Sequence, residues 1–304
     1  MLSYTPMKWT ASAAFALALL SCGGGADGTK DPSMQADTLD TTAQQSETSL
    51  MKVGGKLFSI PSPVQTALLI RKAGLPYEKG LPMPADGADK MATKLQRALA
   101  LGAFGADLAY VTVHKDGQRA LSTLQTVQKL SAQLELSNAF DQQMLDGFKK
   151  SLNNEDSLLR FTGSAFRMAD KYLKNNNRDD VSALVLTGGW IEGMYLTLSG
   201  TNEKSDVSLI NRLGEQRKTL ENLVALLEST DTEKTHGPLV SGLKDVLSAY
   251  AGVGATYEFR PPSTDAAKKT TYVNSVSTVT MTPEQFKAIA SKVKALRATI
   301  TATA

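Results

Sequence analysis

Two stretches of the chain are apolar on nearly every face of a helix, and they constrain the fold more than any other feature. Residues 98–113 (ALALGAFGADLAYVTV) and residues 181–198 (VSALVLTGGWIEGMYLTL) carry one charged residue each. A helix without a polar face has to be surrounded by other elements, so both are predicted at the centre of a helical bundle. Their lengths resemble membrane spans, but the charges and glycines within them favour a protein interior.

Amphipathic segments are predicted to surround these two helices. Apolar residues recur at helical spacing within residues 120–134, 140–152, 158–173 and 209–227. Two capping boxes, Ser62–Gln65 and Thr282–Gln285, mark the starts of further helices. No repeat of fixed length runs through the chain, so a solenoid is not expected. The predicted fold is mainly α, an irregular multi-helix bundle.

One region departs from the helical pattern. Residues 255–259 and 270–280 are rich in β-branched and aromatic residues, and a Pro-containing basic stretch lies between them. This pattern predicts a small β-hairpin near the C-terminus, over about residues 255–280. A lone hairpin is only marginally stable in water, so we expect it to pack against the helices.

The lone charges of the two apolar segments are Asp107 and Glu192. A buried carboxylate costs several kcal/mol unless it is paired or protonated. One interpretation is a buried acidic site with Arg167, Tyr110 or Trp190 as neighbours. The other is a pair of interhelical bonds that fix how the helices align. The second interpretation predicts that both Asp107→Asn and Glu192→Gln lower stability.

Motifs for other chemistry are absent from the sequence. The two histidines, His114 and His236, are far apart and adjoin turn residues, so both are expected at the surface, and no metal site is predicted. The sequence contains no GxSxG, SxxK or phosphate-binding glycine motif. The net charge of +3 comes from mixed signs along the chain, which does not indicate nucleic-acid binding. No catalytic residue, metal or cofactor is therefore predicted.

The N-terminus has the pattern of a secretory signal peptide over residues 1–21. A lone cation, Lys8, precedes an apolar core of residues 11–20, which is too short to span a bilayer. The polar residues that follow predict a flexible tether over 22–55, and a helical domain over 56–304. Cys22 is the single cysteine, so no intramolecular disulfide can form and stability has to come from a core.

Leu19-Leu20-Ser21-Cys22 resembles the lipobox of bacterial lipoproteins. The resemblance implies signal cleavage between Ser21 and Cys22, a diacylglycerol on the Cys22 sulfur and an acyl chain such as palmitate on its new amino group. Several acyl chains suffice for stable membrane anchoring. Gly23 takes the place of the aspartate that retains enteric lipoproteins in the inner membrane. By analogy, we expect an outer-membrane lipoprotein that faces the periplasm.

Several phrases of the mature chain, such as FSIPSPVQTALLI, GADLAYVTV and NNNRDDVSALVLTGGWIE, resemble a group of helical lipoproteins from Bacteroidota. The resemblance covers about residues 57–200. It implies a compartment and a helical fold, and it brings no catalytic motif with it.

Three functions remain open from the sequence. The first is a non-catalytic docking or scaffold module that binds another envelope protein. The second is a periplasmic receptor with a small-ligand pocket between the apolar helices. The third is an enzyme with a carboxylate site at Asp107 and Glu192. A filled bundle centre around Trp190 would favour docking, and a cavity of a few hundred Å³ would favour the receptor.

Overall fold

The computed structural model describes residues 49–53, 56–60, 62–136, 142–151, 175–201, 207–268 and 270–301, with short pieces between 154 and 173. The predicted signal peptide, Ser21, Cys22 and most of the predicted tether lie outside these residues. The prediction of a mainly α fold is confirmed. The helices are α1 (Pro63–Lys72), the 3₁₀ helix η2 (Ala85–Lys90), α2 (Lys94–Val113), α3 (Gly117–Gln133), α4 (Gln142–Ser151), α6 (Asp179–Ser199), α7 (Val207–Thr230), α8 (Gly237–Ala249) and α9 (Pro283–Thr301).

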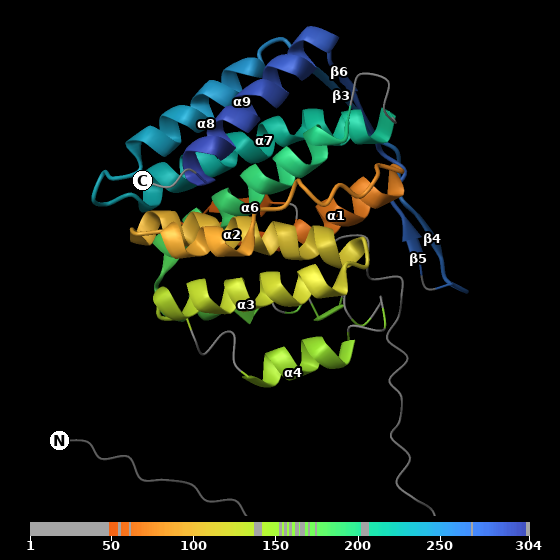
Figure 1. Ribbon diagram of the computed structural model, residues 1–304. Coiled ribbons are helices and arrows are strands. Elements are labelled where there is room, and N and C mark those ends of the chain that lie inside the picture. Colours follow the sequence, from red (N-terminus) through yellow and green to blue (C-terminus); the bar gives the residue numbers. More distant parts are fainter. Residues whose placement is uncertain are drawn as a thin grey trace, which may run out of the picture. The chain divides into compact units, whose positions relative to one another are not determined.

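The two apolar segments become α2 and α6, which pack against each other at the centre. In Figure 1, α3 lies on one side of them and α7, α8 and α9 lie on the other. Every residue from Ala98 to Val113 in α2 is buried. Helix α6 is long and apolar enough to cross a membrane, yet 78% of its apolar window is buried inside the protein. This burial is what a core helix requires.

Glycines bring the backbones of α2 and α6 into contact. A Cβ added to Gly102 would lie 1.8 Å from the carbonyl oxygen of Val185, and one added to Gly188 would lie 2.0 Å from that of Leu99. Both distances are shorter than any van der Waals contact, so only glycine fits at these two positions. The crossing of the central helices therefore depends on residues that have no side chain.

Capping boxes begin the helices where the sequence predicts them. The Gln65 backbone N–H donates to Ser62 Oγ at 3.2 Å, and the Ser62 backbone N–H donates to Gln65 Oε1 at 3.3 Å. Thr282 and Gln285 make the same pair of bonds at the start of α9, at 2.8 and 3.2 Å. Each box satisfies backbone N–H groups that the first helical turn leaves without partners.

The predicted C-terminal hairpin is present, but its second strand is divided. The strands are β3 (Gly254–Glu258), β4 (Ser263–Asp265), β5 (Thr270–Tyr272) and β6 (Val276–Thr280), with β3 antiparallel to β6 and β4 antiparallel to β5. We call residues 254–280 the arm. The ladder is interrupted at Pro261 and Pro262 because proline has no backbone N–H. Asn274 bridges the gap by donating to Pro261 O at 2.9 Å.

The base of the arm packs against α7, as predicted. The Asn211 amide donates to Ser277 O at 3.3 Å and accepts from the Val279 N–H at 2.9 Å. Val279 lies over Gly214, where an added Cβ would come within 2.2 Å of its side chain. In Figure 1, β4 and β5 extend beyond the helices.

A second antiparallel pair precedes the helices. Strands β1 (Ser49–Val53) and β2 (Lys56–Ile60) pair in register from Ser49–Ile60 to Val53–Lys56. This pair crosses the boundary predicted at residues 55 and 56, so β1 lies within the range assigned to the tether.

Candidate functional site

Asp107 on α2 and Glu192 on α6 meet in the interior, and both are fully buried. Asp107 Oδ2 accepts a hydrogen bond from the Met83 backbone N–H at 2.9 Å. Its Oδ1 accepts none from the described residues. The two carboxyl groups interact directly with each other. The two lone charges of the apolar helices therefore form one buried acidic pair.

Arg297 on α9 neutralises this pair. Its Nε donates to Glu192 Oε2 at 2.7 Å, and its Nη2 donates to Glu192 Oε1 at 2.8 Å, which is the two-pronged geometry of a strong ion pair. The same Nη2 donates to Leu81 O at 3.1 Å, and the guanidinium lies 3.9 Å from the centre of the Tyr195 ring. One arginine thus joins α9, α6 and the segment that precedes η2. We call Asp107, Glu192 and Arg297 the buried triad.

The buried triad contains two carboxyl groups and one cation, so a single proton would balance its charge. Burial, and then the negative charge of Glu192, raise the pKa of Asp107 well above its usual value. Burial also raises the pKa of Glu192, but the hydrogen bonds and charge of Arg297 oppose that increase. We infer that Glu192 is the ionised partner of Arg297, and that Asp107 is a neutral acid that donates its proton to Glu192.

The neighbours predicted for the acidic pair are different in the structure. The Trp190 Nε1–H donates to Gln216 Oε1 on α7 at 3.0 Å, because residues two apart on a helix point to different sides. The Tyr110 hydroxyl accepts from the Glu78 N–H at 3.0 Å and makes no hydrogen bond to either carboxyl group among the described residues. Arg167 lies outside the described residues. Neither side chain hydrogen-bonds to the acidic pair among the described residues, although Tyr110 is near enough for the charge of Asp107 to contribute to its raised pKa, after burial.

Arg297 is not among the site residues predicted from the sequence, although its position in α9 indicates that it is buried. The buried face of α9 comprises Phe286, Ile289, Val293, Leu296 and Ile300. Arg297 is four residues after Val293, so a cation falls within this apolar stripe. A cation on an apolar face suggests a buried counter-charge. The pattern does not reveal which carboxylate supplies it.

A second polar cluster lies at the C-terminal end of α2. The Tyr77 ring stacks on His114 with a centroid distance of 5.1 Å, and Tyr110 lies 4.7 Å from His114. The Tyr77 hydroxyl donates to Asp116 Oδ2 at 2.7 Å, while Asp116 Oδ1 accepts from the Arg119 N–H and caps α3. Burial lowers the pKa of His114, which keeps the ring neutral. The cluster fastens the segment after α1 to the end of α2.

The histidines are not the surface residues that the sequence suggested. His236 is only 6% exposed, with Nδ1 at 3.7 Å from Asp231 Oδ1. His114 is partly buried, and its Nε2 is inaccessible to solvent. His114 is stacked on Tyr77, and His236 lies beside Asp231. Within the described ranges, no three His, Cys, Asp or Glu side chains gather as metal ligands would.

The protonation of the buried triad leads to a prediction for Asp107→Asn. An asparagine can accept from Met83 and donate to Glu192, so the loss of stability that the sequence predicts for Asp107→Asn should be no more than about 1 kcal/mol at about pH 5. An acid whose pKa is raised by folding stabilises the protein below its unfolded pKa, and this stability is lost as the pH rises through the folded pKa. The variant should therefore gain on the wild type as the pH increases. Urea unfolding at about pH 5 and about pH 9 measures the difference.

A matched control is Asp116→Asn, because hydrogen bonds from Tyr77 and Arg119 lower the pKa of Asp116. The stability from that group is present above its unfolded pKa, so the difference between variant and wild type should not move in the same direction. A loss of stability in Asp107→Asn that is equal at both pH values would show that Asp107 is an ordinary ionised partner.

The buried triad is a closed assembly that joins four parts of the chain. Its oxygens are directed at Met83, at Arg297 and at each other, which suits alignment of helices better than attack on a substrate. Comparison with known proteins adds no relative: no family model, curated protein or solved structure matches the chain.

Proposed function

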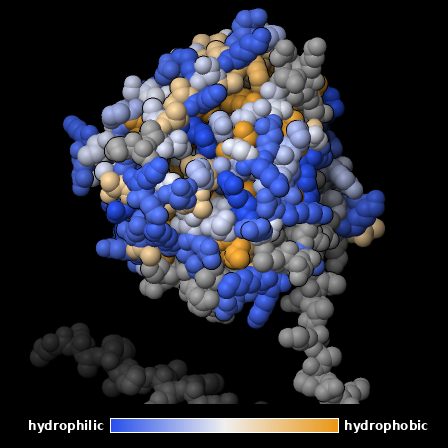
Figure 2. Space-filling model, viewed as in Figure 1, coloured by the Kyte–Doolittle hydropathy of each residue, from blue (hydrophilic) through white to orange (hydrophobic). Residues whose placement is uncertain are grey.

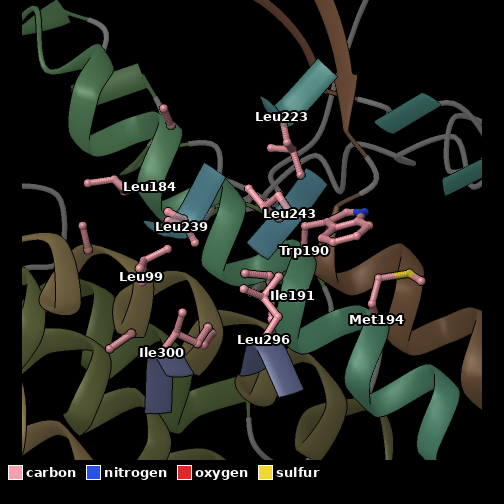
Figure 3. Packing of buried hydrophobic residues seen from close by; sticks show 14 of the residues in the cluster. Leu99, Leu184, Trp190, Ile191, Met194, Leu223, Leu239, Leu243, Leu296 and Ile300 are labelled. Carbon is pink, nitrogen blue, oxygen red and sulfur yellow. The ribbon is translucent and has the colours of Figure 1, made fainter. Parts of the chain in front are cut away.

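We propose that the protein is a lipid-anchored cell-envelope protein whose helical domain is a non-catalytic docking module. The packing around Trp190 is the observation that supports docking over ligand reception. Trp190 is 6% exposed, and the described side chains of α6, α8 and α9 pack together in the bundle interior, as Figure 3 shows. A receptor for a small ligand would instead need an apolar cavity there.

The described residues do form a recess of about 370 Å³, but it lies at the ends of the helices. Its lining is mainly charged or polar, and comprises Lys94, Arg97, Gln133, Leu134, Glu135 and Arg178. Small-ligand pockets are predominantly apolar. The recess therefore does not favour the receptor function.

The buried triad argues against an enzyme that uses Asp107 and Glu192. Both carboxyl groups have no exposed surface, and Arg297 is 16% exposed at its side chain. A general acid or base must come within hydrogen-bond reach of the proton that it transfers. A substrate could reach these carboxyl groups only if α2, α6 and α9 separated.

The anchor leads to a prediction for Cys22→Ala. We expect the wild-type protein to fractionate with membranes and Cys22→Ala to be soluble with an unchanged melting temperature. Cys22 lies 27 residues before Ser49, where the described fold begins, and the polar composition between them predicts a tether that separates the anchor from the core. Gly23→Ala is the control, because it keeps the cysteine and should remain in the membrane.

Mass spectrometry of the native protein provides the direct test. An acylated Cys22 at the mature N-terminus is the expected result, and an unmodified N-terminus at any other residue would contradict the anchor.

Purification in detergent should then recover a second envelope protein in fixed ratio. A domain that purifies alone at every detergent and salt concentration would contradict docking.

A further inference from the structure

Most of the exposed large hydrophobic side chains among the described residues belong to the arm. Of seven large hydrophobic side chains exposed among the described residues, five belong to the arm: Tyr257, Phe259, Tyr272, Val273 and Val276. The exposed fractions of Phe259 and Val273 are 68% and 79%. The face in Figure 2 is otherwise mostly hydrophilic, with small apolar patches. Exposed aromatic residues gathered in one element mark an interaction surface.

Asn211 shows which edge of the β3–β6 pair is open. Its amide bonds to Ser277 O and to the Val279 N–H, so one side chain of α7 occupies the outer edge of β6. The backbone groups of Ser277 and Val279 therefore point away from β3. In an antiparallel ladder, residues that point toward the partner strand alternate with residues that point away.

The register then identifies the free groups on β3. Ser277 is opposite Tyr257, and Val279 is opposite Ala255. Because opposite residues in the ladder share their orientation, Ala255 and Tyr257 direct their N–H and C=O groups to the outer edge of β3. All five residues of β3 are exposed, and no described residue pairs with this edge. β3 is an open edge strand, and β6 is a closed one.

The charges near this edge are already neutralised. Arg260 donates to both oxygens of Glu258, at 2.8 and 2.9 Å, and Lys268 lies 3.5 Å from Asp265. Edge strands are usually protected by charged side chains, by proline, or by a covering element. Among the described residues, no proline and no covering element protects residues 254–258, and the one charged side chain in the strand, Glu258, is held by Arg260. The free edge is suited to an uncharged chain.

We propose that the outer edge of β3 is a docking site for an extended, uncharged segment of a partner protein, which adds to the sheet as a third strand. Backbone hydrogen bonds to Ala255 and Tyr257 would supply affinity, and the Tyr257 and Phe259 rings would select the side chains of the segment. The proposal rests on the proposed docking function and specifies its partner as a strand-forming segment.

Two other occupants fit the arm less well. A membrane-inserting arm needs apolar residues at its tip, but residues 264–268 at the tip are Thr-Asp-Ala-Ala-Lys. A second copy that paired through β3 would use a strand edge roughly 17 Å long. Such a contact falls well short of the roughly 1,200 Å² that a stable interface buries. A peptide segment that binds transiently does not need an interface of that size, because weak and transient contacts bury less than about 1,200 Å².

The experiment uses the mature lipoprotein in detergent and a synthetic peptide that copies residues 274–281, the natural strand partner of β3. Amide hydrogen exchange at Ala255 and Tyr257 is the measurement. Exchange should be fast without peptide and should slow about tenfold when the free peptide is ten times its Kd. A control peptide with proline at the positions of Ser277 and Thr278 should leave exchange unchanged.

Ala255→Pro removes one outward N–H that the fold does not use, so we expect it to weaken peptide binding at least tenfold. Ala255→Val keeps that N–H and should bind as the wild type does. Equal binding of both peptides, equal binding by Ala255→Pro, or no change in exchange at Ala255 would overturn the proposal. So would a dimer that Ala255→Pro converts to monomer, or lipid-vesicle binding that depends on Phe259.

The docking function and the strand-addition site on β3 can be disproved independently of each other. If a partner still co-purifies with Ala255→Pro at the wild-type ratio, the docking function survives and the arm is not its surface. If no partner co-purifies but the peptide protects β3, the edge binds strands and the docking function is wrong.

Discussion

Glu192→Gln should lower the free energy of unfolding by about 3–5 kcal/mol, since it breaks a buried ion pair and leaves Arg297 without its charged partner. The side chain of Arg297 is 16% exposed, so water cannot replace the two hydrogen bonds at 2.7 and 2.8 Å. Glutamine keeps the size of the side chain and loses only the charge and one acceptor. Urea denaturation near neutral pH measures the effect.

A second prediction concerns the coupling between Asp107 and Glu192. Without the negative charge of Glu192, the cation of Arg297 favours ionisation of Asp107, which can partly replace the lost counter-charge. The double variant Asp107→Asn with Glu192→Gln removes that compensation. We therefore expect a cost larger than the sum of the two single changes, by about 1 kcal/mol or more. Strict additivity would show that the two carboxyl groups do not share a proton.

A surface ion pair is the control for Glu192→Gln. Glu228 receives a 2.6 Å bond from Lys244, and both side chains are about half exposed. Exposed pairs contribute about 0–1 kcal/mol, so Glu228→Gln should change stability by no more than that. If Glu192→Gln costs as little as Glu228→Gln, the interior of the buried triad is hydrated and its role in aligning the helices is minor.

Helix positions and buried faces could be predicted from the sequence because they depend on local chemistry. The two segments with a single charged residue each had to become the central helices, and the Ser62 and Thr282 capping boxes start helices where expected. The hairpin followed from β-branched and aromatic residues, but the division of its second strand did not. That division coincides with Pro261 and Pro262, which supply no N–H to the ladder, and with a one-residue shift of register between the Glu258–Val276 and Ser263–Tyr272 pairs.

Partners that are distant in the sequence could not be predicted in the same way. Asp107 and Glu192 were identified because each is alone in an apolar helix. Arg297 lies 105 residues from Glu192 in the sequence. Hydrophobic periodicity predicts which face of α9 is buried, but it does not predict which helix packs against that face. Tyr110 and Trp190, which are close to the pair in the sequence, form their hydrogen bonds with Glu78 and Gln216 instead. Tertiary packing determines such contacts, so the three members of the buried triad could be identified together only in the folded structure.

The N-terminal boundary shows a similar limit. Residues 50–53 and 57–60 are two short apolar runs around Gly54-Gly55, which is a hairpin signal in the sequence. The residues before this hairpin signal are polar, and their composition predicts a tether that continues to residue 55. Composition averages over a window, whereas strand pairing depends on the few residues at the turn.

Gly188→Ala should destabilise the protein by about 3 kcal/mol or more, although alanine is the better helix former. The new methyl carbon would lie 2.0 Å from the carbonyl oxygen of Leu99. That oxygen belongs to the backbone of α2 and cannot rotate away, so α2 and α6 would have to separate along their crossing. For a domain of this size, the melting temperature should fall by roughly 2–4 °C for each kcal/mol.

Gly193→Ala, five residues further along α6, is the matched control. A Cβ there would lie 3.6 Å from Thr66 Cγ2, which is an ordinary contact. Without a clash, the change removes the conformational freedom of glycine in the unfolded chain and should stabilise the protein by up to about 1 kcal/mol. The same substitution in one helix should therefore have opposite signs at the two positions. A Gly188→Ala variant as stable as Gly193→Ala would mean that α2 and α6 do not cross at backbone contact, and that the glycines are not what sets their separation.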